Sequence, residues 1–213
     1  AGPQETFGEW CARSDFRAQV LEPFRAVVAR DLRTFSVLAT VPLNWAWPSP
    51  RVRLLERGYR RFLGGLKLGE LPESPAFVFC ATDLSFGCNF EFSRRRVGDF
   101  QAGYLRDPGA VAVATAVAAS SCFPPLFGPL RLGASALDFS GGKQSGSELL
   151  DRIELSDGGV YDNMATEPAL KRSARILVSD AGAPFAFEAG RHYLRRLLRY
   201  AAVVGNQAIA LRK

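Results

Sequence analysis

The chain has 213 residues, of which 47% are hydrophobic and 23% are charged, an ordinary composition for a single globular domain. No stretch of about 18 uncharged apolar residues occurs, which argues against a membrane-spanning helix. The net charge of +6 is compatible with nucleic acid, an anionic membrane or simple solubility. No zinc-finger spacing, RNP-like sequence or long Lys/Arg tract accompanies it, so nucleic acid is not expected as a partner.

Two helices are predicted in the first third of the chain. Residues 16–35 carry apolar side chains at intervals of three and four, as do residues 51–66 after a Trp- and Pro-rich break. The second helix has a cationic face, formed by Arg51, Arg53, Arg57, Arg60 and Arg61. That face is either solvated, the interpretation that we favour, or rests on anionic lipid head groups.

The middle of the chain predicts two strands and a small-residue helix. Residues 77–82 are a short apolar run typical of a buried strand, and residues 89–93 alternate as a strand with one buried face does. An Ala/Val-rich helix follows, with Asp107 as a cap at its start and Pro124 at its end. Residues 140–147 form a flexible loop that we expect to join two strands.

The last third predicts strands at residues 152–155 and 175–179 with a short helix, residues 166–172, between them. A basic amphipathic helix is expected over residues 184–213. Strands that alternate with helices favour an α/β fold with a mainly parallel sheet.

Cysteine and histidine usage gives no metal pattern. None of Cys11, Cys80, Cys88 and Cys122 forms Cys-x-x-Cys, and the sole histidine, His192, is remote in sequence. We expect the cysteines to be reduced and structural, no metal to bind, and the protein to be cytoplasmic or peripherally membrane-bound. The first residues have neither the basic end nor the apolar run of a signal peptide.

The strongest candidate for a site is the segment of residues 156–163. Asp157 directly follows a predicted strand, and functional groups of α/β sheets gather beyond the carboxyl ends of strands. Gly158 and Gly159 behind it permit a tight turn with positive φ, so that the carboxylate can project into a cleft. The alternative is an ordinary strand-to-helix turn with an Asx-type side-chain bond.

A second element spans residues 112–129. Its small residues allow neighbouring backbones to approach closely, and its exit, rich in Phe and Pro, could line an apolar groove. Core packing alone would explain the same composition.

Together the two elements resemble the patatin-like phospholipase family. There, a helix ending in Ala-Ser-Ser-x-Phe-Pro-Pro-x-Phe precedes a strand and an Asp-Gly-Gly motif with a following Asn; residues 119–127 and 157–163 match this order. Residues 81–84 and 176–182 are similar to two of the family's strand segments. The resemblance covers residues 75–183 and implies a three-layer acyl hydrolase fold within a single domain, residues 1–213.

The resemblance implies a Ser–Asp dyad that acts on phospholipid or another acyl ester. Asp157 matches the base that accepts the serine proton, while Gly158, Gly159 and Asn163 match positions that shape its loop. Backbone N–H groups of a glycine-rich loop would stabilise the oxyanion, and neither histidine nor a cofactor is needed.

The sequence departs from the family at the nucleophile. The family's Gly-x-Ser-x-Gly elbow between strand and helix is absent. Ser85 and Ser135 lie in strings that each lack one glycine, and Ser85 lies after the elbow in family order. We therefore expect a partial domain, without the N-terminal strand and elbow, that does not hydrolyse esters by itself.

Two alternatives stay open at this point. The chain could be a catalytically inactive pseudo-hydrolase that binds acyl chains or anionic membrane through its arginine-rich helices. It could also be an unrelated α/β domain in which Asp157-Gly158-Gly159 is only a turn.

Overall fold

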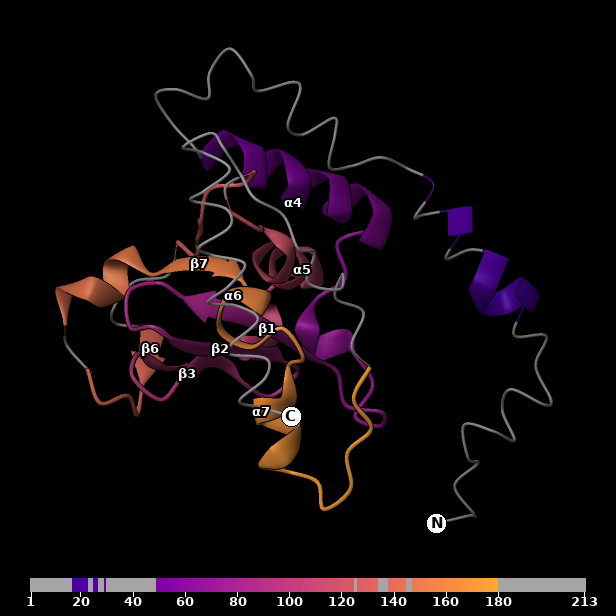
Figure 1. The fold of residues 1–213 in the computed structure, drawn as a ribbon. Coiled ribbons are helices and arrows are strands. Elements are labelled where there is room, and N and C mark those ends of the chain that lie inside the picture. The colour runs from indigo at the N-terminus through magenta and orange to yellow at the C-terminus, as the bar shows by residue number, and fades with distance from the viewer. Residues whose placement is uncertain are drawn as a thin grey trace, which may run out of the picture.

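The structure is a computed structural model that describes residues 17–22, 25–26, 29, 49–124, 126–133, 138–144 and 147–179 (Figure 1). It contains the helices α4 (Ser49–Leu63), α5 (Val113–Ser121), α6 (Gly159–Asp162) and α7 (Thr166–Leu170). A π-helical turn lies at Arg17–Leu21, and 3₁₀ turns lie at Leu68–Glu70, Pro108–Ala110 and Glu148–Arg152.

Seven strands form one sheet in the order β5-β7-β1-β2-β3-β4-β6. Their bounds are β1 (Val78–Asp83), β2 (Cys88–Ser93), β3 (Val97–Asp99), β4 (Gly103–Leu105), β5 (Leu130–Arg131), β6 (Phe139–Ser140) and β7 (Glu154–Asp157). β1 lies between β2 and β7, with Ala81 opposite Phe90 on one side and Asp157 on the other.

The expectation of a mainly parallel sheet is wrong for the described strands, whose pairings are all antiparallel. The reason lies in the connections. Only residues 84–87 join β1 to β2, and Gly87, with φ 67°, donates its N–H to the carbonyl of Asp83 at 2.8 Å. A parallel pair needs a crossover of a dozen or more residues, whereas a turn this short makes a hairpin.

One face of the sheet packs against α5. Val113, Ala116 and Ala119 of α5 share a buried core with Phe90 and Phe92 of the sheet. The opposite side of α5, through Ala118 and the adjoining Cys122, packs against Val52 and Leu55 of α4. Because α5 is buried on both sides, its small apolar residues run around the helix and form no single stripe.

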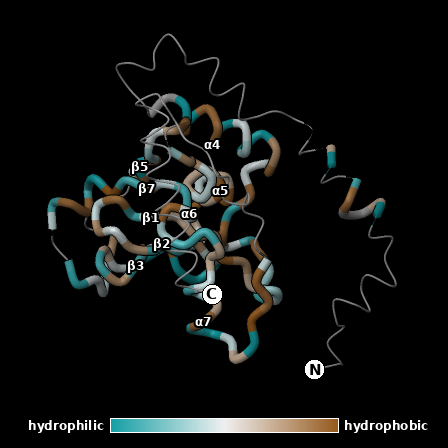
Figure 2. The backbone as a smooth tube through the Cα atoms, in the orientation of Figure 1, coloured by the Kyte–Doolittle hydropathy of each residue, from teal (hydrophilic) through white to brown (hydrophobic). Residues whose placement is uncertain are grey.

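Helix α4 is the outermost element on this face (Figure 1). Along it the backbone alternates between hydrophobic and hydrophilic residues, as expected for a helix with one buried side (Figure 2). Arg51 and Arg53 donate to the carbonyls of Leu126 and Arg131, at 2.6 and 3.3 Å. The predicted helix at residues 51–66 is thus confirmed, and part of its cationic face contacts the protein itself.

The other face of the sheet carries α6 and α7. Successive residues of a strand point to opposite faces, so Cys80 and Thr82 of β1 face away from Ala81 and α5. The backbone N–H of Tyr161 in α6 contacts Thr82, and Arg172, just beyond α7, pairs with Glu91 of β2 at 2.6 Å. Helices therefore lie against both faces of the sheet.

Three other expected elements differ in detail. Asp107 caps the 3₁₀ turn Pro108–Ala110, accepting from the N–H of Ala110, and α5 begins only at Val113. The strand predicted at residues 152–155 begins at Glu154, because Arg152 ends a 3₁₀ turn. No strand forms at residues 175–179, where Leu177 is 99% exposed, so the prediction of a buried strand there is wrong.

Several predicted features fall outside the described residues: most of the helix at residues 16–35, the basic helix at residues 184–213, Cys11, Ser135 and His192. Among the helices that the structure describes, none has both the length and the apolarity that a membrane crossing requires.

Candidate active site

Asp157 is the last residue of β7 and is half-buried. Its carboxylate Oδ1 accepts the backbone N–H of Gly159 at 2.7 Å, which closes an Asx turn between the strand and α6. Asp157 therefore lies at the carboxyl end of a strand, as the sequence predicts, with its side chain oriented by the turn that follows it.

The glycine pair is explained by a lack of room for a Cβ atom, and not by a positive φ. Gly158 has φ −59° and ψ −29°, an ordinary helical conformation, so the expected left-handed turn is not found. A Cβ at Gly158 would lie 2.4 Å from the carbonyl oxygen of Cys80 on β1. A Cβ at Gly159 would lie 2.8 Å from Oδ1 of Asn163 and 3.0 Å from Oδ1 of Asp157. The turn is thus pressed closely against the central strand.

Thr82 of β1 makes two hydrogen bonds to the same turn. Its buried hydroxyl donates to the carbonyl of Asp157 at 2.8 Å and accepts the backbone N–H of Tyr161 at 3.1 Å. One side chain thereby links the end of β7, the first turn of α6 and the middle of the sheet.

The two segments singled out in the sequence meet at Cys122, which directly follows α5. Its carbonyl accepts the N–H of Asp157 and the hydroxyl of Ser156, each at 3.4 Å. Its buried thiol donates to the carbonyl of Leu155 at 3.4 Å. The exit of the small-residue helix and the strand end that carries Asp157 are therefore in direct contact.

Each of the two contacting segments also carries exposed apolar side chains. Phe123 and Leu126 follow Cys122, and each is 54% exposed; Val160, in α6, is 46% exposed. The half-buried Asp157 and exposed apolar side chains thus occur in the same two contacting segments.

The comparison with known protein families shows to which family this chain is related. Residues 11–170 match the patatin-like phospholipase family, well over half of the chain. The chain belongs to the patatin-like phospholipase family. No curated protein matches it. The matched region includes both the exit of α5 and the segment of residues 156–163, so the resemblance inferred from these two segments is confirmed.

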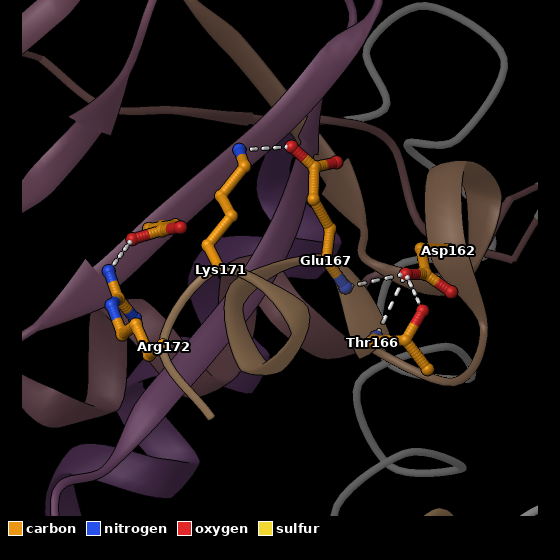
Figure 3. A network of polar contacts seen from close by, with 6 residues as sticks. Asp162, Thr166, Glu167, Lys171 and Arg172 are labelled. Carbon is orange, nitrogen blue, oxygen red and sulfur yellow. Dashed lines mark hydrogen bonds and ion pairs between the residues drawn. The ribbon is translucent and has the colours of Figure 1, made fainter. Parts of the chain in front are cut away.

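Asn163, another position matched to the family motif, follows α6 and is exposed. Its neighbour Asp162, which is 4% exposed, makes the hydrogen bonds that hold this loop. Asp162 Oδ2 accepts the N–H of Thr166 and the Thr166 hydroxyl, both at 2.9 Å, and the N–H of Glu167 at 3.2 Å (Figure 3). Burial raises the pKa of the Asp162 carboxyl, but the hydrogen bonds from Thr166, Glu167 and Met164 outweigh it, and the net effect lowers this pKa.

Two ion pairs lie at the end of α7, one local and one to the sheet (Figure 3). Lys171 lies 2.6 Å from Glu167 within the helix, and Arg172 reaches Glu91 of β2 at the same distance. The pair with Glu91 joins two elements far apart in sequence, so it helps fix α7, and with it the Asp162 loop, on the sheet.

Ser85 lies away from Asp157. It is exposed in the β1–β2 turn, where its N–H donates to Asp83 Oδ1 at 2.6 Å. The preceding residue, Leu84, donates its N–H to the carbonyl of Glu154, the first residue of β7, whereas Asp157 is the last. Three residues of strand span about 10 Å, so the structure does not bring Ser85 to the aspartate.

The cysteines that the structure describes, Cys80, Cys88 and Cys122, are free and buried, in agreement with their expected structural role. Burial, as the largest cause, raises the pKa of the Cys80 thiol to about 11 and those of Cys88 and Cys122 to about 12. These thiols are protonated at neutral pH and are not nucleophiles. Within the described residues, no three His, Cys, Asp or Glu side chains are grouped to hold a metal ion.

Thr82 is the site residue that inspection of the sequence missed. It lies in the segment of residues 81–84, which is similar to a family strand, but a threonine in a strand ordinarily signals β-propensity alone. Only the pairing of β1 with β7, which places Thr82 opposite Ser156, brings its hydroxyl to the turn.

Proposed function

We propose that this chain supplies the aspartate of a Ser–Asp dyad in a lipid acyl hydrolase. The observation that carries the proposal is the direct contact between the turn of Asp157 and the exit of α5, inside the region that matches the family. A carboxylate held in place by its turn is what the general base of an esterase requires.

In the proposed reaction the serine oxygen attacks the ester carbonyl carbon while its proton passes to the Asp157 carboxylate. The tetrahedral intermediate collapses, the alcohol leaves with that proton, and water then hydrolyses the acyl-enzyme by the same route. The serine would come from a segment outside the 213 residues, because the sequence contains no Gly-x-Ser-x-Gly.

The exposed apolar residues favour an acyl ester as substrate. Phe123, Leu126 and Val160 offer hydrocarbon contacts within a few residues of the aspartate or its bonded neighbour Cys122. Each methylene buried against such a surface contributes about 0.8 kcal/mol. We therefore propose an acyl chain on this surface, with the ester group at Asp157.

Esterase assays on the complete natural protein that contains this chain test the proposal. Asp157→Asn keeps an oxygen for the Gly159 N–H but removes the basic carboxylate, so hydrolysis of a p-nitrophenyl ester should fall by about a thousand-fold or more. Circular dichroism should show an unchanged fold. Turnover like that of the unaltered protein would exclude Asp157 as the base.

A second candidate, a lipid-binding module without catalysis, is favoured by the outer side of α4. Arg57 and Arg61 are exposed there, beside Phe62, which is 44% exposed. Co-sedimentation of the chain with vesicles tests this candidate: binding should require anionic lipid and should fall as salt rises. Replacing Arg57 and Arg61 by Gln should weaken it, and equal binding to neutral vesicles would exclude it.

A further inference from the structure

The hydroxyl of Thr82 in β1 bonds the turn of Asp157 at two points. We infer that Thr82 is a positioning residue, which sets the direction of the Asp157 carboxylate through the backbone; this inference rests on the proposed function. Both of these bonds join the Thr82 hydroxyl to the backbone, so its effect passes through the carbonyl of Asp157 and the N–H of Tyr161.

The hydroxyl is fully used in this arrangement. A threonine hydroxyl has one proton to donate and lone pairs to accept with. The proton goes to the Asp157 carbonyl at 2.8 Å, and a lone pair takes the Tyr161 N–H at 3.1 Å. Because the side chain is 4% exposed, water cannot readily replace it. The two bonds therefore hold Asp157, just before the glycine pair, and Tyr161, two residues after it, at a set separation.

The carboxylate follows this backbone. Its Oδ1 is bonded to the N–H of Gly159, which lies between the two points that Thr82 holds. Gly158 meets the carbonyl of Cys80 from the same strand, so the turn rests on β1 at two places. If the hydroxyl is removed, the turn keeps its contact at Gly158 but loses the bonds that set its rotation on the strand.

A positioning role predicts a loss in the chemical step and not in substrate binding. Displacement of a catalytic group by about 1 Å lowers the rate by up to about 100-fold. Thr82→Val, which has nearly the same shape, should lower kcat by about 10- to 100-fold and leave KM within about two-fold. Thr82→Ser restores the hydroxyl and should recover most of kcat.

Thr115→Val is the matched control. Thr115 of α5 also uses its hydroxyl in an internal bond, to Glu56 Oε1 at 2.6 Å, on the side of α4. It should lower thermal stability as Thr82→Val does, but leave kcat within about two-fold. Any general effect of losing an internal hydroxyl is thereby separated from an effect on Asp157.

The experiment uses the complete natural protein, with kcat divided by the burst amplitude so that only molecules with a working site are counted. Asp157→Asn is measured in parallel. If Asp157→Asn is inactive and Thr82→Val keeps full kcat, the positioning role is wrong and the proposed function stands. If Asp157→Asn stays active, the proposed function itself is wrong.

A third variant covers the case in which Thr82→Val does not fold. Thr82→Cys has a similar size and a weaker, longer donor, so its kcat should lie between those of the serine variant and the inactive Asp157→Asn. Full kcat in Thr82→Cys together with a loss in Thr82→Ser would overturn the inference, because the order would then not follow hydrogen-bonding strength.

Discussion

The carboxyl groups of Asp83 and Asp99 interact directly in the protein interior, at the ends of β1 and β3. Asp83 is fully buried and Asp99 is 2% exposed. Oδ1 of Asp83 accepts the N–H groups of Ser85 and Phe86, and Oδ1 of Asp99 those of Gln101 and Ala102. Within the described residues neither Oδ2 has a hydrogen-bond partner. Because burial and like charge disfavour two carboxylates side by side, the pair favours keeping one proton.

This pair should make the protein less stable as pH rises from about 4 to neutrality. Burial first, and then the charge of Asp99, raise the pKa of Asp83 to about 6, and burial also raises that of Asp99. The folded state then holds a proton that the unfolded state, with an ordinary pKa of about 4, releases. The stability contributed is complete below about pH 4 and is lost as pH rises through about 6. Urea unfolding from about pH 5 to 8 should show a decline of roughly 1–3 kcal/mol.

Asp99→Asn should remove this decline. The amide keeps an oxygen for the N–H groups of Gln101 and Ala102 and offers an N–H₂ to Asp83 Oδ2. The free energy of unfolding at pH 8 should therefore rise by roughly 1 kcal/mol, and its slope between about pH 5 and 8 should flatten. An unchanged slope in the variant would assign the pH dependence to other groups. Asp99→Ala, which loses both oxygens, should instead be less stable at every pH.

Gly158→Ala should disrupt the Asp157 turn through a backbone clash. Its Cβ would lie 2.4 Å from the carbonyl of Cys80, and the strand cannot move without disturbing the centre of the sheet. We expect a loss of roughly 1–3 kcal/mol in the free energy of unfolding, measured with urea. Gly159→Ala is the comparison and should cost less, because its Cβ would meet only side-chain atoms, Asn163 Oδ1 at 2.8 Å and Asp157 Oδ1 at 3.0 Å, and side chains can shift where the backbone of β1 cannot. Equal losses in the two variants would contradict this explanation.

Local patterns in the sequence predicted the part of the site that depends on chain order. The apolar run before Asp157 indicated a strand end, and the small residues up to Ser121 indicated a buried helix. Their contact at Cys122 could be expected only from the family resemblance. The antiparallel direction of the sheet was missed because alternating strands and helices outweighed the four-residue connection before Cys88, which was the better signal.

Tertiary contacts account for what the sequence could not show. Thr82 bonds a residue that lies 75 positions later in the sequence. Asp83 and Asp99 come near each other because their strands, β1 and β3, both flank β2 in the sheet. Residues 176–178 are apolar enough to predict a strand, but the described structure offers no neighbouring strand that pairs with them, and they stay exposed. A sequence pattern shows that a segment could form a strand, but the strand forms only where a neighbouring strand can pair with it.

Asp162 should stabilise the loop behind the glycine pair through its charge. Its lowered pKa means that the folded state favours the carboxylate, so the contribution is present above the ordinary pKa of about 4 and is lost as pH falls below it. Asp162→Asn replaces an acceptor with a donor that faces N–H groups, and should cost roughly 1–3 kcal/mol at pH 7 by urea unfolding. Lys171→Met, which breaks only an exposed pair, should cost under about 1 kcal/mol. A loss in Asp162→Asn no larger than that of Lys171→Met would show that the buried carboxylate does not hold the loop.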